Sequence, residues 1–208
     1  MVEKMSSYIV DNMLFKGETI DSDKREVMMF GITRILEDVP KYVLIFLIAL
    51  FLGVLKEAGI ILLVTFIYKT FIGGAHANSN ISCFIFSTLF FISPSIIAKF
   101  VDIPSTYFII ALTCINIFSL YVIKRYAPAD TEEVPILNKK KRETMKIFAV
   151  VSQILIDVSL FTIIKDNNIR EVILITLFYC DFMTTKIAYK FLKCTRASES
   201  EEFKEYFN

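Results

Sequence analysis

Apolar residues along this chain are gathered into six blocks, and most charged residues lie between them. Blocks of this length and apolarity are typical of helices that cross a lipid bilayer, where backbone groups can bond only within the protein. The pattern therefore predicts an all-α, polytopic membrane protein with about six transmembrane helices. The blocks cover residues 40–55, 58–71, 81–100, 106–123, 147–164 and 172–187.

The first two blocks are short, and only Lys56 and Glu57 separate them. We expect two helices joined by a tight turn at the outer membrane face. One long, tilted helix with a buried Lys-Glu step also fits the pattern. In the third block, Pro94 predicts a kink because proline lacks the N–H that a helix needs.

Residues 1–38 interleave basic and apolar positions without a long apolar block. The spacing within 22–38 predicts an amphipathic helix on the cytoplasmic membrane surface, with a solvated leader segment as the alternative. The predicted organisation is this N-terminal segment, a six-helix membrane domain at 39–190 and a charged cytoplasmic tail at 191–208.

Composition supports the membrane assignment and argues against several kinds of site. Of the 208 residues, 55% are hydrophobic, and the mean hydropathy of +0.57 is too high for an ordinary soluble domain. A net charge of +1 gives no basis for nucleic-acid binding. One histidine and no C-x-x-C pair argue against zinc, and no glycine-rich phosphate loop is present, so we expect no metal or other cofactor.

Basic residues are distributed unevenly between the two sets of connections. The N-terminal segment, Lys69, the polar loop 124–146 and the tail hold most of them. By the positive-inside rule this set is cytoplasmic, which places both termini and the connection after Lys69 in the cytoplasm. The three opposite turns hold only Lys56, Lys99, Lys165 and Arg170.

The most distinctive polar stretch is 69–83, which contains the only histidine, His76, and ends at Cys83. On an unbroken helix these two residues would share a face but lie roughly 10 Å apart along the axis, too far for a hydrogen bond. Gly73-Gly74 and Asn78-Ser79-Asn80 favour a helix end or turn between them. Such a break could bring His76 back toward Cys83.

Asn80 is a candidate N-cap that would place Cys83 at the third helical position, where N–H groups and the helix dipole favour an anion. A nearby imidazolium would further favour the nucleophilic thiolate. The plainer interpretation is a small packing cysteine and a hydrogen-bonded histidine. Candidates for binding or supporting an oxyanion are the N–H groups of Ser82 and Cys83, the side chains of Asn78 and Asn80, and Gly74.

Two motifs resemble the AgrB family of membrane endopeptidases, which process quorum-sensing propeptides in Gram-positive bacteria. Gly74-Ala75-His76-Ala77 followed by Cys83 is similar to the family signature. Tyr126-Ala-Pro-Ala-Asp-Thr131, with Pro135 beyond it, resembles the family's loop between its central and last membrane segments. The family often carries two arginines before the glycine, and Lys69-Thr70 stands there in this chain.

The resemblance implies that Cys83 attacks a peptide bond of an AgrD-like propeptide while His76 transfers protons. The acyl-enzyme would be a thioester, and a thiol or hydroxyl of the peptide would then close a thiolactone or lactone ring. A membrane-face pocket suits this chemistry because excluding water suppresses hydrolysis. The resemblance also implies a multi-pass protein of the bacterial cell membrane, embedded in the lipid bilayer, and suggests a homodimer.

Several charged residues are candidates for substrate binding. Lys69 offers a point charge where a guanidinium is more usual. Asp130 could bind a basic peptide or form a turn with Pro128. A basic run could recognise an acidic propeptide tail or merely anchor the membrane topology; it consists of Lys139, Lys140, Lys141 and Arg142.

Asp157 and Asp181 lie within predicted spans, where ionisable residues often have a function. Either could orient His76 or bridge two helices. In a second interpretation the chain is a small multispanning peptide exporter or channel component, whose passage His76 and these aspartates line. A third is a lipid-modifying acyltransferase that carries its acyl group on Cys83.

Overall fold

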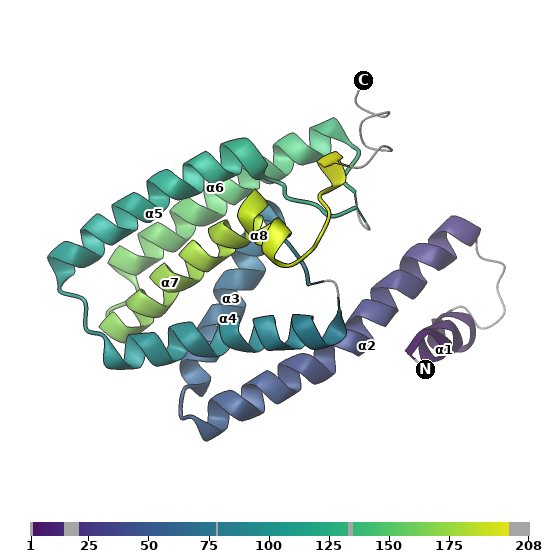
Figure 1. Ribbon diagram of the computed structural model, residues 1–208, viewed down its shortest axis with the longest axis horizontal. Helices are drawn as coiled ribbons and strands as arrows, with labels where there is room; N and C mark the ends of the chain where they lie inside the picture. The colour runs from purple at the N-terminus through teal and green to yellow at the C-terminus, as the bar shows by residue number, and fades with distance from the viewer. Residues whose placement is uncertain (1, 15–20, 78, 133–134, 200–208) are drawn as a thin grey trace. The chain divides into compact units, whose positions relative to one another are not determined.

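The computed structural model describes residues 2–14, 21–77, 79–132 and 135–199 (Figure 1). Every regular element within these ranges is a helix, and only two isolated β-bridges occur in them. The predicted all-α fold is therefore confirmed. The chain divides into two compact units, Met1–Phe51 and Leu52–Asn208, which we describe separately.

In the first unit, α1 (Val2–Tyr8) and the π-helical turn η1 (Ile9–Leu14) pack against α2 (Ser22–Phe51). Arg25 of α2 joins them: its Nε and one Nη donate to the two carboxylate oxygens of Asp11, at 2.9 and 2.7 Å. These bonds to the guanidinium lower the pKa of Asp11. The unit is thus held by one bidentate ion pair as well as by apolar contacts.

The helix α2 continues through Pro40, so the segment predicted at 22–38 and the first apolar block belong to one helix. The chain breaks after Phe51, where residues 52–54 form a turn with Gly53 at a φ of 67°. Because α3 (Leu55–Ile72) begins after this turn, the interpretation as two helices is correct and the single long helix is wrong. The turn falls just before Lys56-Glu57 rather than at it.

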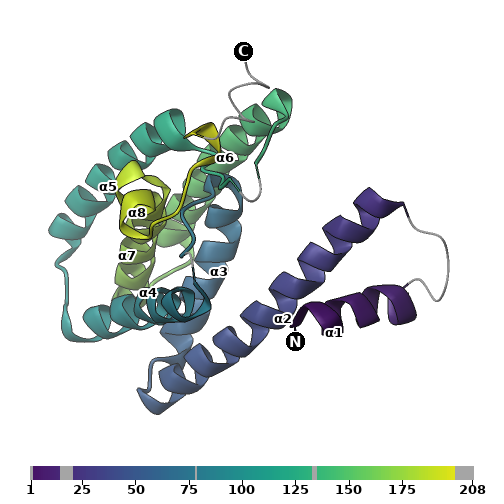
Figure 2. The same cartoon turned by 45° about the vertical axis from the view of Figure 1, so that its right-hand side comes forward.

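The second unit is a bundle of α3, α4 (Asn80–Phe100), α5 (Ser105–Tyr126), α6 (Lys139–Thr162) and α7 (Asn167–Thr184), built around α7 (Figure 2). This helix packs against α3, α4 and α5, and α6 packs against α3 and α5. Buried residues occur around most of the circumference of α7. The short α8 (Lys186–Phe191) and the 3-10 turn η2 (Ala197–Glu199) follow α7 along the chain.

Three of the described helices, α4, α5 and α6, are long and apolar enough to cross a membrane. They expose large apolar side chains, among them Ile109, Ile117 and Ile154. In a bilayer these side chains meet lipid tails rather than water, so their exposure carries no hydrophobic penalty. The chain is a membrane protein, while the count of six spans stays a prediction.

The helices of this unit alternate in direction, which gathers their connections at two ends. At the His76 end, residues 73–75 meet the connection after α5 and the last turn of α7. At the opposite Glu171 end, the connection before α5 meets the start of α7, where the Ile103 N–H donates to the Glu171 carboxylate. Consecutive membrane spans require this alternation.

A buried polar network ties four helices together near the His76 end. The hydroxyl of Tyr68 in α3 donates to Asp181 Oδ1 in α7 at 2.7 Å and also contacts the hydroxyl of Ser119 in α5. Ser119 donates to Gln153 in α6, whose amide donates to Asn116 at 2.6 Å. Tyr68, Ser119 and Asp181 are fully buried, so these bonds fix the register of the helices without competition from water.

Replacing Tyr68 with Phe should destabilise the bundle, because it removes the donor to a buried carboxylate and leaves the ring in place. We expect a loss of about 1–3 kcal/mol in the free energy of unfolding. Thermal unfolding of the purified protein in detergent measures it as a lower midpoint. Tyr107→Phe is the matched control, since Tyr107 is 65% exposed. Equal midpoints for the two variants would show that the network contributes nothing.

Candidate active site

Residues 73–77, after the end of α3, leave the helical path and form the connection that carries His76. The helix α3 ends at Ile72 and α4 begins at Asn80, with residues 74–77 outside any helix. The helix break predicted between His76 and Cys83 is therefore confirmed.

Three backbone hydrogen bonds, each 2.8 Å long, hold the start of this connection, and we call them the backbone clamp. The N–H of Ala129 donates to the carbonyl of Ile72, and the N–H of Gly74 donates to the carbonyl of Ala129. The N–H of Ala75 donates to the carbonyl of Met183 in the last turn of α7. The two motifs that resembled one family are thus bonded directly to each other, as a parallel bridge between Gly73 and Ala129.

The connection that the clamp holds requires glycine at its first residue, Gly73. Gly73 has a φ of 73°, in the left-handed region that other residues rarely adopt. A Cβ on Gly73 would lie 2.3 Å from the Ala129 carbonyl oxygen, which is a severe overlap with backbone. Gly74, at a φ of 146°, lies so close to Lys69 and Met183 that a Cβ would be 3.3 Å from each.

Apolar packing against α8 also supports the clamp. Ala75 is buried in a cluster with Ala129, Ala188 and Tyr189, so that α8 covers the connection. Ala77 packs against the edge of the same cluster. The residues on both sides of His76 are therefore held, while the His76 side chain itself is exposed.

Cys83 lies in the first turn of α4, and its side chain is half-buried. The N-cap of α4 is Ser79, whose Oγ accepts a hydrogen bond from the Ser82 N–H at 3.2 Å. The predicted cap, Asn80, is wrong by one residue: Asn80 is the first residue of the helix, and Cys83 is the fourth. The thiol is still in the turn where the helix dipole favours an anion.

The capping geometry also engages two of the predicted oxyanion donors. The N–H of Ser82 is bonded to the Ser79 hydroxyl, and the N–H of Cys83 is bonded to the Ser79 carbonyl at 2.8 Å. Both N–H groups are engaged within the helix start, so they do not point at a reacting carbonyl in this structure. Asn78, another predicted candidate, lies outside the described residues.

Lys69 lies in the last turn of α3, half-buried beside the connection. Its ammonium is 5.8 Å from the centre of the Phe90 ring, and its stem borders Gly74. Within the described ranges no carboxylate forms an ion pair with it. The structure therefore places one positive charge next to the backbone that carries His76.

Asp130 and Arg142, both predicted to bind substrate, form an ion pair with each other. Their ion pair is 2.7 Å long, and the side chains are only 5% and 18% exposed. Asp130 Oδ2 also accepts from the Ile136 N–H, and Arg142 donates to the Ile136 and Pro128 carbonyls. Both residues fold the connection between α5 and α6, which agrees with the turn-forming alternative for Asp130.

That connection is shorter than the predicted polar loop at 124–146, because α5 runs to Tyr126 and α6 begins at Lys139. The basic run is therefore helical. Asn138 caps this helix by accepting from the Lys141 N–H at 3.1 Å, and the three lysines of the run are exposed in the first turn.

Sequence reasoning missed the part of the tail that braces the site. Arg196 is buried between the rings of Tyr126 and Tyr189, about 5.0 and 4.9 Å from their centres. Burial raises the pKa of Tyr189, which therefore keeps its proton and donates to the Asp130 carbonyl at 3.1 Å. The charged tail gave no local signal for this, since the partners lie far away in sequence.

The two predicted intramembrane aspartates have different surroundings. Asp181 accepts from Tyr68, so it bridges α7 and α3, as the helix-bridging alternative for it predicted. Asp157 is half-buried on α6, and its Oδ1 is bonded to no described residue.

Comparisons with family profiles and with known proteins both point to one family. The profile of the family described as AgrB, Accessory gene regulator B, matches residues 2–185. An AgrB-like protein of Clostridium acetobutylicum is 28% identical over 192 residues, covering 92% of this chain and 89% of its own length. An AgrB-like protein of Listeria monocytogenes is 25% identical over 190 residues, covering 91% of each chain. No solved structure matches.

Replacing Gly73 with Ala should disrupt the backbone clamp, because the new Cβ would overlap the Ala129 carbonyl and the φ is unfavourable. We expect a loss of about 1–3 kcal/mol in the free energy of unfolding from the strained φ, and more from the overlap. Thermal unfolding in detergent measures this loss.

Gly59→Ala is the matched control, since Gly59 is helical and a Cβ there would have nothing within 4 Å. That variant should be neutral or slightly stabilised. An unchanged midpoint for Gly73→Ala would contradict the clamp.

Proposed function

Since this chain belongs to the AgrB family, we propose that it is a membrane-embedded cysteine endopeptidase that processes an AgrD-like quorum-sensing propeptide. It cleaves off the C-terminal part of the propeptide through a thioester acyl-enzyme and promotes closure of a thiolactone or lactone ring. His76 and Cys83 are the proposed catalytic residues.

One observation carries this proposal: the only histidine has an exposed side chain on the clamped connection between α3 and α4, and Cys83 lies in the first turn of α4. Structural histidines in membrane bundles are usually buried among polar partners, whereas a proton-transfer group has to reach a substrate. The clamp fixes the backbone next to His76 while leaving its ring accessible. This arrangement suits a residue that meets a peptide at the membrane surface.

The proposed first step forms one bond and breaks another. The Cys83 sulfur attacks the carbonyl carbon of the scissile peptide bond, the C–N bond breaks, and His76 delivers the thiol proton to the departing amine. A thiol or hydroxyl of the bound peptide then attacks the thioester, releases Cys83 and closes the ring. Exchange of one thioester for another is nearly balanced in free energy, so this ring closure needs no ATP.

Positive charge near the site suits an acidic substrate. Lys69 lies beside Gly74, and Lys139, Lys140 and Lys141 occupy the first turn of α6. Basic residues at a helix N-terminus oppose the helix dipole, at a cost of roughly 0.3–1 kcal/mol each. An acidic propeptide tail bound there would offset that cost.

Among the groups predicted for the oxyanion, the Asn80 side chain, at the first position of α4, is the candidate we retain.

The proposed location is the bacterial cell membrane, with both termini and the His76 end in the cytoplasm, where a newly made propeptide is available. Homodimerisation is part of the proposal at the level of the family.

The second candidate, a peptide exporter or channel component, would use the buried polar network around Asp181 as its passage. It requires no chemistry at Cys83, which makes the two functions separable.

Replacing Cys83 with Ala should abolish cleavage of a co-expressed propeptide, measured as the ratio of precursor to product on a gel. Cys83→Ser should leave at most a trace, because a hydroxyl is a far weaker nucleophile than a thiolate. His76→Gln should also block cleavage, since glutamine cannot transfer the proton.

Cys114→Ala is the control for this series, because Cys114 is an exposed thiol on a candidate span, away from the His76 end. It should cleave normally. Normal cleavage by Cys83→Ala would rule out the protease and favour the exporter.

Replacing Lys140 and Lys141 together with Gln should weaken binding of an acidic propeptide tail, raising KM by roughly threefold to tenfold at low salt. The difference should shrink as ionic strength rises, because exposed charges are screened. Lys165→Gln, at the Glu171 end, is the control. An unchanged KM at low salt would indicate that the basic run serves only topology.

A further inference from the structure

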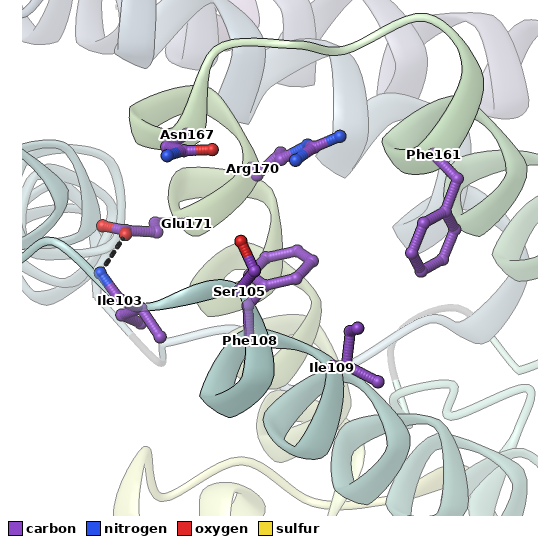
Figure 3. Close-up of a pocket in the computed structure, with 8 residues that line it drawn as sticks. All are labelled: Ile103, Ser105, Phe108, Ile109, Phe161, Asn167, Arg170 and Glu171. Atoms are coloured by element: carbon purple, nitrogen blue, oxygen red, sulfur yellow. Dashed lines mark hydrogen bonds between the residues drawn. The ribbon is translucent and has the colours of Figure 1, made fainter.

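A cavity of about 200 Å³ lies at the Glu171 end of the bundle, away from the candidate active site (Figure 3). It is smaller than the roughly 300–1,000 Å³ pockets that enclose whole drug-sized ligands. Its walls come from the start of α5, the end of α6 and the start of α7. A ligand of this site would therefore insert only a small part of itself.

Glu171 supplies a buried acidic group in the cavity wall. The residue is only 2% exposed. Its Oε1 accepts a 2.6 Å hydrogen bond from the Ile103 N–H, while its Oε2 is buried without a hydrogen bond to any described residue. A buried carboxylate oxygen without a donor is costly, and a donor with positive charge would remove that cost.

Arg170 supplies the opposite charge beside it (Figure 3). Its Nε donates to the carbonyls of Leu160 and Ile164, which fixes the guanidinium at the end of α6. Its two terminal nitrogens form no hydrogen bond within the described ranges. Arg170 and Glu171 form no ion pair with each other, and their charged groups point in different directions (Figure 3). The cavity wall thus holds a fixed cation and a fixed anion at separate places.

Ser105 and Asn167 add polar groups to the wall, and the rest of it is apolar and continues onto the lipid-facing surface. Phe108 is buried, whereas Ile109 of α5 and Phe161 of α6 are each 52% exposed. Both helices are candidate spans, and the cavity lies where α5 begins and α6 ends. Helix ends of membrane spans lie at the level of the lipid headgroups.

We propose that this cavity binds the headgroup of a phospholipid that carries a primary amine. The phosphate accepts hydrogen bonds from the terminal nitrogens of Arg170, and the ammonium donates to Glu171 after a small side-chain movement that opens Oε2. The acyl chains lie along Ile109 and Phe161 in the bilayer. A choline headgroup has the same two charges but no N–H, so it cannot satisfy the carboxylate.

Native mass spectrometry of the purified full chain, released from nanodiscs with equal amounts of phosphatidylethanolamine, phosphatidylcholine and phosphatidylglycerol, tests this site. We expect one retained phosphatidylethanolamine, favoured about tenfold over phosphatidylcholine. Glu171→Gln should abolish that preference, because its amide keeps an acceptor for the Ile103 N–H but loses the charge.

Ile109→Trp is a second variant that fills the cavity from its exposed wall and should also lose the bound lipid. Glu57→Gln is the matched control, since Glu57 is at the same end and accepts from Asn168 outside the cavity; it should retain the lipid. The proposal is overturned if phosphatidylcholine is retained equally, if Glu171→Gln keeps the preference, or if the retained molecule is a peptide.

Discussion

The candidate site depends on the backbone clamp, three hydrogen bonds that hold the chain just before His76. They join α3, the connection after α5 and the last turn of α7, so the path of the chain is set by parts of the sequence far from it. Backbone bonds of this kind do not depend on side-chain identity except where a side chain would not fit. At Gly73 it would not fit, which gives that glycine a definite physical role.

The clamp in turn relies on the packing of the bundle. Tyr68 and Asp181 join α3 to α7 in the interior, within about one helical turn of the clamp, and so fix the distance between two of its anchors. On the other side, the ion pair of Asp130 and Arg142 and the buried Arg196 hold the loop that carries Ala129. The site end is therefore braced by polar contacts, and the lipid-facing helices α4 to α6 remain apolar.

Much of this architecture could be predicted from the sequence, because apolar blocks and glycines act locally. The helix break before Cys83 and the turn between α2 and α3 were both predicted, although the turn was misplaced by a few residues and the α4 cap by one. Sequence reasoning did not predict that Ala129 binds Gly74 or that Asp130 pairs with Arg142. Those contacts are non-local, and the residue types involved fit several roles equally well.

Amide hydrogen exchange at Gly74 and Ala75 tests the clamp most directly, with the full chain in nanodiscs. If both N–H groups are bonded to the Ala129 and Met183 carbonyls, their exchange should be slowed by at least roughly a hundredfold relative to an unstructured peptide. Exchange of these two amides at the unstructured rate would contradict the account, since two of the three bonds of the clamp would then be absent.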